Sequence, residues 1–204
     1  TDEVERKASR GEINKIGVMV PEPIGTHLRP VGEDVAEGTC VLRKGAVLRP
    51  SEIGILASIG LETITVIRRP VVAILATGDE IVSPGKSLSG GKIFDSNSSS
   101  IAALVLRYGG LTEWLGVAID DLDDLHQKLQ RGLSADLLIT SAGVSKGDYD
   151  IVKDVLMKNG EIDFWSVRMR PAKPLAWGTL IGSNNQRVSH KGIPVNPDSA
   201  MIAF

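Results

Sequence analysis

The sequence predicts an α/β protein: an open, mostly parallel sheet with helices on both faces, preceded by part of a mixed α+β domain. From residue 70 onward, apolar runs alternate with segments of helical spacing, which is typical of parallel strands joined by crossover helices. The runs at 71–76 and 136–140 are almost continuously apolar, as in strands buried on both faces. Residues 1–69 lack this regularity, so we predict one domain at 1–69 and another at 70–204.

The N-terminal segment contains short apolar stretches interrupted by glycine and proline. Residues 16–20 and 39–42 are predicted to be strands, with Cys40 a small apolar filler in the second. A short helix with Ser51 as its cap is predicted to follow. Two strands cannot close a sheet of their own, so we expect only part of a domain here.

The C-terminal segment divides into strands and helices of ordinary length. Further strands are predicted at 111–117, 162–167 and 175–180, and helices at 96–108, 121–133 and 151–158. Leucines recur along one side of the helix at 121–133. Its acids Asp123 and Asp124 are predicted to form a solvated face.

Composition excludes several classes of protein. Hydrophobic residues make up 42% and charged residues 24%, as in an ordinary globular chain rather than a disordered one. The net charge of -2 and the aromatic content of 4% argue against a nucleic-acid binder. No apolar run approaches the ~20 residues that cross a bilayer. The single cysteine fits a reducing compartment, so we expect a cytoplasmic protein without a membrane partner.

Acidic and small residues follow three of the predicted strands. Thr77-Gly78-Asp79-Glu80 comes after the first strand and Asp120-Asp121 after the second. A loop rich in glycine and serine runs from Ser141 to Asp150 after the third. Because ligands bind beyond the carboxyl ends of the strands in an open parallel sheet, we expect these loops to meet at one edge.

These loops predict a magnesium-assisted site for a phosphorylated small molecule. Small residues before a helix leave backbone N–H groups free to hold phosphate, and clustered carboxylates repel that phosphate unless a cation bridges them. Mg²⁺ takes a few carboxylates together with phosphate oxygens. The alternative is that the acids are ordinary turn formers and helix caps, and the residues alone leave both interpretations open.

A series of motifs in fixed order makes the chain resemble a known family. The motifs are Leu28-Arg29-Pro30-Val31-Gly32-Glu33-Asp34, Thr77-Gly78-Asp79-Glu80, Lys92-Ile93-Phe94-Asp95-Ser96-Asn97, Ser141-Ala142-Gly143-Val144-Ser145 with Asp150, Pro171-Ala172-Lys173-Pro174 and Pro194-Val195-Asn196-Pro197. Over residues 13–204 the chain is similar to the molybdopterin molybdenumtransferases, the MoeA-type family that includes the gephyrin E domain. The C-terminal segment then resembles a molybdopterin-binding domain with a MogA-like fold.

The resemblance implies an enzyme of molybdenum cofactor biosynthesis. Such enzymes cleave adenylylated molybdopterin in a molybdate- and Mg²⁺-dependent step, release AMP and leave molybdenum on the dithiolene. The resemblance also implies a homodimer, with a molybdopterin adenylyltransferase as a candidate partner. Family members carry more sequence before Thr1 and a small β-rich domain after Phe204, so we expect that C-terminal domain to be absent from these residues.

Motif matching assigns roles to residues of the loops. Asp34, Glu80, Asp120 and Asp150 are the predicted catalytic acids, and the last three are the predicted Mg²⁺ ligands. The predicted substrate-binding residues are Arg29, Thr77, Gly78, Asp79, Ser141, Gly143, Ser145, Lys146, Arg170, Lys173, Pro194, Asn196 and Pro197.

Three loops lack a glycine that the family pattern has. Ala142, Ala172 and Val195 stand at those positions. Where such a position needs a positive φ, alanine costs roughly 1 kcal/mol and a β-branched residue more. These replacements motivate one alternative, a catalytically impaired paralogue acting as a pterin-binding sensor or scaffold. A CinA-type nucleotide pyrophosphatase on the same fold is the other alternative.

Overall fold

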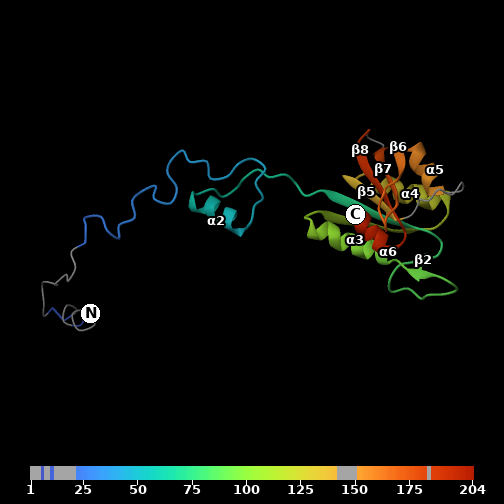
Figure 1. Ribbon diagram of the computed structural model, residues 1–204, viewed down its shortest axis with the longest axis horizontal. Coiled ribbons are helices and arrows are strands. Elements are labelled where there is room, and N and C mark those ends of the chain that lie inside the picture. The colour runs from blue at the N-terminus through green and yellow to red at the C-terminus, as the bar shows by residue number, and fades with distance from the viewer. Residues whose placement is uncertain (1–5, 7–9, 12–21, 142–150, 183–184) are drawn as a thin grey trace. The chain divides into compact units, whose positions relative to one another are not determined.

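The computed structural model describes residues 6, 10–11, 22–141, 151–182 and 185–204 (Figure 1). Contacts divide the chain into two units, Thr1–Val66 and Ile67–Phe204. Each unit is described below by itself.

Helix α2 (Pro50–Ser58) belongs to the first unit. Proline suits the first turn because its ring presets φ and no N–H donor is needed there. Glu52 Oε2 accepts the backbone N–H of Arg49 at 2.9 Å. Arg49 is therefore the N-cap, and Ser51, the predicted cap, lies inside the first turn.

The predicted strand at 39–42 is wrong. These residues form no strand, and Cys40 is exposed rather than buried as a filler. The local bonds are those of turns: Thr39 N–H donates to Ala36 O, and Cys40 Sγ donates to Leu42 O at 3.3 Å. No other strand in the described residues 22–66 is present to pair with this stretch. The predicted strand at 16–20 lies outside the described residues.

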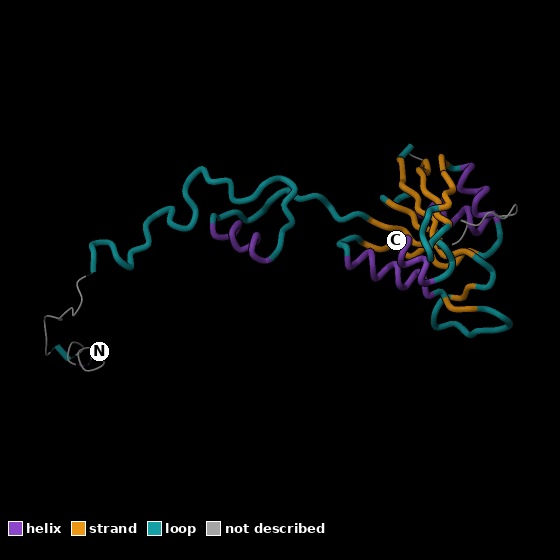
Figure 2. The backbone as a smooth tube through the Cα atoms, viewed as in Figure 1, coloured by secondary structure: helices purple, strands orange, loops and turns teal. Residues whose placement is uncertain are grey.

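Six strands form one sheet in the second unit, in the order β4-β1-β5-β8-β7-β6. Their bounds are β1 (Val71–Thr77), β4 (Leu111–Ala118), β5 (Leu137–Ser141), β6 (Gly160–Ser166), β7 (Pro174–Ile181) and β8 (Arg187–Ile193). The first four in spatial order are parallel, whereas β7 and β6 are antiparallel to their neighbours. Figure 2 shows these strands with the helices of the second unit around them. The predicted α/β fold is confirmed, and the hairpin of β6 and β7 makes the sheet mixed.

Strand β8 has no counterpart in the sequence-based prediction. Arg187, Ser189 and Lys191 interrupt its apolar character, so neither a continuous apolar run nor a clear hydrophobic alternation marks it. In the structure it lies between β5 and β7, and its alternate residues Val188 and His190 are completely buried. A separate two-stranded pair, β2 (Ile81–Val82) with β3 (Ile93–Phe94), was too short to predict.

Helices cover both faces of the large sheet. Helices α4 (Leu122–Gly132) and α5 (Ile151–Lys158) contribute buried residues to the hydrophobic cluster on one face. Helices α3 (Ser96–Arg107) and α6 (Pro197–Ala203) contribute to the cluster on the other face. The predicted helices at 96–108, 121–133 and 151–158 are thus present within a residue or so of their expected ends.

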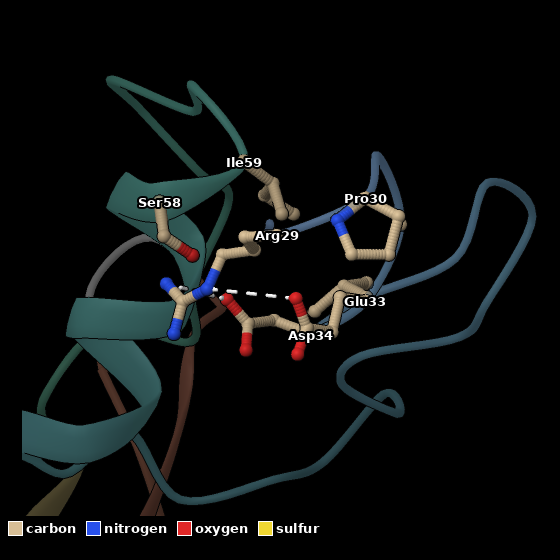
Figure 3. A pocket seen from close by; sticks show the side chains of 8 residues that line it. Arg29, Pro30, Glu33, Asp34, Ser58 and Ile59 are labelled. Atoms are coloured by element: carbon tan, nitrogen blue, oxygen red, sulfur yellow. Dashed lines mark ion pairs between the residues drawn. The ribbon is translucent and has the colours of Figure 1, made fainter. Parts of the chain in front are cut away.

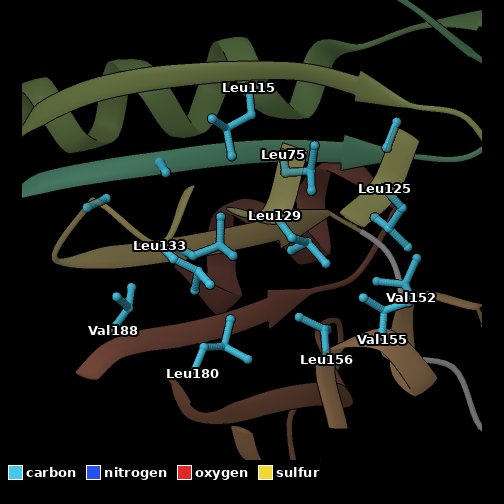
Figure 4. Packing of buried hydrophobic residues seen from close by; sticks show 14 of the residues in the cluster. Leu75, Leu115, Leu125, Leu129, Leu133, Val152, Val155, Leu156, Leu180 and Val188 are labelled. Carbon is cyan, nitrogen blue, oxygen red and sulfur yellow. The ribbon is translucent and has the colours of Figure 1, made fainter. Parts of the chain in front are cut away.

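Alternate residues of β1 belong to different hydrophobic clusters, because successive side chains of a strand point to opposite faces of the sheet. Ala73 and Leu75 belong to the first cluster, shown in Figure 4, whereas Val72 and Ile74 belong to the second. Helix α4 approaches the sheet closely at Gly132, where a Cβ would lie 2.8 Å from Leu115 Cδ1. Among the helices that the structure describes, none combines the length and apolar character that a bilayer span requires.

Candidate active site at the carboxyl edge of the sheet

The four parallel strands end at one edge of the sheet, so the loops that follow them start side by side. Thr77 of β1 is in register with Ala118 of β4, and Ser141 of β5 with Ile193 of β8. After β1 the chain continues to α3 on one face, whereas after β5 it continues to α5 on the other. Neighbouring strands whose connections leave to opposite faces form the switch point at which α/β proteins bind ligands.

Glu80 follows β1 with its carboxylate against the backbone of Gly78. The φ of Gly78 is 133°, and a Cβ at this position would lie 2.7 Å from Glu80 Oε2. The Gly78 N–H also donates to Ala118 O at 3.1 Å, which ties this loop to the end of β4. The missing side chain at Gly78 therefore makes room for the Glu80 carboxylate.

Asp79 joins the loops that follow β1 and β4. Its Oδ1 accepts the backbone N–H of Asp120 at 3.0 Å, although the two residues are far apart in the chain. A carboxylate that accepts a backbone N–H holds that backbone in place. Asp79, predicted to bind substrate, thus has a structural bond to the loop of Asp120, one of the predicted catalytic acids.

The structure brings two of the three predicted Mg²⁺ ligands onto adjoining loops. Glu80 and Asp120 are both exposed and follow paired strands. Asp150 lies outside the described residues. Within the described part of the chain, no group of three or more His, Cys, Asp or Glu residues is arranged to hold a metal ion. Magnesium binding therefore stays a prediction.

Two hydroxyl groups lie buried at the ends of the central strands. Thr77 and Ser141 are each 2% exposed, and neither Thr77 Oγ1 nor Ser141 Oγ has a hydrogen-bond partner in the structure as described. Buried hydroxyls are usually satisfied, and exceptions concentrate where a ligand or water completes the bonding. The predicted residues Gly143, Ser145 and Lys146 of the following loop lie outside the described residues.

Two predicted basic residues line a cavity beside the β6–β7 hairpin. Arg170 and Lys173 stand in the loop before β7, and both are exposed. A cavity of about 450 Å³ is lined by residues 169–174 together with Ser199 of α6. Two cationic side chains in the lining of a cavity favour an anionic ligand. The loop closes on itself through the Val167 N–H, which donates to Lys173 O at 2.8 Å.

The replaced glycines fall on two kinds of backbone. Ala172 has a φ of 75°, in the left-handed region that favours glycine, and only 3% of its surface is exposed. Val195 is outside that region and is half-exposed. Ala142 lies outside the described residues. The positive φ considered from the sequence is therefore found at Ala172 and not at Val195.

The loop after β8 positions helix α6. Asn196 is its N-cap, with Oδ1 accepting the Ser199 N–H at 3.1 Å, and Pro197 occupies the first turn. Pro194 is buried just before them. These three predicted substrate-binding residues thus shape the loop, whatever else they contact.

Asn97 was missed as a site residue. Its Nδ2 donates to Val195 O at 2.6 Å, so it connects the start of α3 with the loop after β8. It is 5% exposed, and its Oδ1 has no hydrogen-bond partner in the described residues. The signal that marks it in the sequence is its place in the motif at 92–97, two residues after Asp95, which caps α3 by accepting the Ser98 N–H.

The remaining predicted residues, Arg29 and Asp34, meet in the first unit. The Arg29 guanidinium lies 3.4 Å from Asp34 Oδ2 and 3.7 Å from Glu33 Oε2 (Figure 3). They line a pocket of about 210 Å³ together with Ser58 and Ile59 at the end of α2. All three charged side chains are exposed by about half or more, so an incoming anion can compete with these carboxylates for Arg29.

Fold and loops define the class of protein: an α/β domain whose candidate ligand site lies at a switch point between parallel strands. A family model described as a probable molybdopterin binding domain matches residues 73–204. A second, described as the MoeA N-terminal region (domain I and II), matches residues 2–60. The chain belongs to the MoeA-type molybdopterin molybdenumtransferase family, which confirms the resemblance noted in the sequence.

Individual relatives support the same assignment. A molybdopterin molybdenumtransferase of Haemophilus influenzae is 37% identical over 186 residues, covering 91% of this chain and 45% of the relative. Molybdopterin molybdenumtransferase 2 of Mycobacterium tuberculosis is 35% identical, covering 97% of this chain and 49% of the relative. The chain thus spans about half the length of these curated relatives.

A solved structure shows the same architecture. The molybdopterin biosynthesis MoeA protein from Pyrococcus horikosii matches with a TM-score of 0.71 and 29% identity. The match covers 83% of this chain and 41% of that one.

Proposed function

We propose that the protein inserts molybdenum into molybdopterin, with adenylylated molybdopterin and molybdate as substrates and AMP as a product. The observation that carries this proposal is the meeting of the Glu80 and Asp120 loops, bridged by Asp79, at the switch point of the sheet in a chain of this family. The relatives are named as transferases, which favours this reaction over a nucleotide pyrophosphatase or a pterin sensor.

The acids of this edge suit a hard divalent cation. Glu80 and Asp120 offer exposed carboxylate oxygens, the donors that Mg²⁺ accepts beside phosphate oxygens and water. We propose that they hold Mg²⁺ together with Asp150. When bound, Mg²⁺ would neutralise negative charge on the pyrophosphate of the substrate. The Glu80 carboxylate, lying against Gly78, is already turned toward the end of β1.

The basic residues would hold the anionic parts of the substrates. Arg170 and Lys173 beside the 450 Å³ cavity can bind an oxyanion, either phosphate or molybdate. The guanidinium of Arg170 offers a planar pair of donors, whereas Lys173 offers a point charge. Arg29 is proposed to act in the same way once an anion displaces Asp34 and Glu33.

Three finer features belong to the proposal. We propose that the protein works as a homodimer, that it receives its substrate from a molybdopterin adenylyltransferase, and that it acts in the cytoplasm. The first two rest on the family resemblance. The third rests on the single cysteine, Cys40, which is exposed and fits a reducing compartment.

An Asp120→Asn variant of the full-length protein tests the proposed metal site. Turnover of adenylylated molybdopterin is expected to fall by about a hundredfold, because the side chain keeps its size but loses the charge that holds Mg²⁺. Calorimetry of substrate binding with and without Mg²⁺ separates binding from chemistry. Asp123→Asn, an exposed acid three residues further on, is the matched control and should remain active. Unchanged turnover in Asp120→Asn would remove the metal role.

A further inference from the structure

The backbone of the segment 117–121, which comprises the last two residues of β4 and the loop after them, is held by hydrogen bonds from both sides. From the β1 side, the Gly78 N–H donates to Ala118 O, and Asp79 accepts the Asp120 N–H. Within the loop, the Asp121 N–H donates to Ile119 O at 2.7 Å. The loop carries Asp120, so whatever fixes this backbone also fixes the origin of the Asp120 side chain.

From the other side, two charged side chains of α4, those of Asp124 and Lys128, bind the backbone of this segment. Asp124 Oδ2 accepts the Ile119 N–H at 3.1 Å. One turn later, Lys128 Nζ donates to Val117 O at 3.0 Å and to the Asp124 carboxylate at 2.5 Å. The side chains of Asp124 and Lys128 are 27% and 21% exposed, so the pair is largely shielded from water. The interpretation of Asp124 as part of a solvated face is therefore wrong.

These contacts differ from helix capping. Asp121 already caps α4 by accepting the N–H groups of Asp123 and Asp124. The Asp124–Lys128 pair instead binds backbone groups of Val117 and Ile119, which precede the helix. The Lys128 hydrogen bond also holds the Asp124 carboxylate in its charged form and lowers its pKa. An ionised carboxylate is the stronger acceptor for the Ile119 N–H.

We propose that Asp124 and Lys128 are positioning residues that hold the segment 117–121, and with it the Asp120 carboxylate, at the geometry that Mg²⁺ binding requires. This inference rests on the proposed function, because it gives Asp120 a metal-binding role. Partners behind a metal ligand orient it, and their loss typically lowers metal affinity or activity about 10- to 100-fold. Mg²⁺ is especially demanding, since it needs near-ideal octahedral geometry.

Hydrogen exchange tests whether the pair holds the loop. In Asp124→Ala the amides of Ile119 and Asp120 are expected to exchange about tenfold faster or more, while the amide of Leu129 in the middle of α4 is unchanged. Lys128→Met, which keeps the apolar stem, should give the same result more weakly. Asp123→Ala removes a neighbouring acid from the same turn and is the matched control. Exchange at Ile119 and Asp120 equal to that of the control would overturn the proposal.

Kinetics of the full-length protein tests whether the held loop matters for the reaction. Asp124→Ala is expected to need about tenfold more Mg²⁺ for half-maximal turnover and to lose kcat with little change in KM for the pterin. Asp124→Asn retains an oxygen for Ile119 and should recover part of the activity. Faster exchange with Mg²⁺ dependence equal to that of Asp123→Ala would refute the positioning role. If Asp120→Asn itself were fully active, the proposed metal site would fail, while the exchange experiment would still report on the loop.

Discussion

The loops 171–174 and 194–197 flank the same end of the second unit, and both replace a glycine of the family pattern, yet their backbones differ. In the first loop, Ala172 is buried and adopts a φ of 75°. In the second, Val195 is half-exposed, has no positive φ, and offers its carbonyl to Asn97. Replacement of a glycine therefore does not cost the same stability at every position. Its cost depends on whether the chain needs the left-handed region at that position, and only one of these two loops does.

The largest effect is expected from exchanging the two side chains between these environments. Ala172→Val should lower the free energy of unfolding by about 3 kcal/mol, because a β-branched residue is strongly strained at the positive φ of this buried position. Val195→Ala, the matched control, should cost only about 0.5 kcal/mol. Urea unfolding monitored by circular dichroism measures both. Equal losses in the two variants would mean that the loops do not differ as described.

A second effect involves β8, the strand that leads into the 194–197 loop. His190 on this strand is fully buried, with Nε2 3.1 Å from Thr140 Oγ1, and burial lowers its pKa to about 4. Below pH 6.5 the imidazole of His190 is protonated in the unfolded chain but stays neutral in the folded chain. The free energy of unfolding therefore falls as the pH drops from 6.5 toward 4. The expected loss is about 2 kcal/mol between pH 7 and pH 5.

Urea unfolding at pH 7, 6 and 5 tests this dependence, and His190→Gln, which can still bond to Thr140, should flatten it. The ion pair of Arg68 with Asp136 does not interfere. The hydrogen bond from Arg68 lowers the pKa of Asp136 to about 2, so the stability that this ion pair adds is lost only below about pH 4. A wild-type stability that is flat from pH 7 to pH 5 would contradict a neutral, buried His190.

The smallest effect comes from restoring glycine in each loop. Ala172→Gly should change the free energy of unfolding by less than about 0.5 kcal/mol, because relief of backbone strain offsets the lost methyl contact and the greater freedom of the unfolded chain. Val195→Gly relieves no strain and should cost about 1 kcal/mol. Thermal unfolding of the two variants in parallel gives the comparison. A loss at Ala172→Gly as large as at Val195→Gly would show that Ala172 is not strained.

Much of the fold could be predicted because its signals are local. The apolar run of β1 and the regularly spaced leucines of α4 predict buried elements from neighbouring residues alone. Strand β8 could not be predicted in this way, because Arg187 and Lys191 interrupt its hydrophobic pattern. It becomes a strand by pairing with β5 and β7, which lie on either side of it. The predicted strand at 39–42 failed for the opposite reason: its apolar residues have no partner strand in the described part of the first unit.

The candidate site shows the same division. The loops with Glu80 and Asp120 could be located from the sequence, since they follow recognisable strands. That Asp79 binds the amide of Asp120, and that Asp124 and Lys128 reach back to the loop before their helix, could not, because hydrogen bonds depend on distances set by several elements at once. The motif around Asn97 was recognised, but its bond to Val195 O was not.

Consecutive residues were enough to predict the fold class, the family and the order of the loops that carry acids and bases, because hydrophobic periodicity and motifs are local properties of the chain. Folding was needed to establish which side chains bind one another across those loops and which replaced glycine stands at a positive φ. Those properties arise when segments distant in the chain are packed against the same sheet, and packing selects one backbone conformation from the several that each loop could adopt alone.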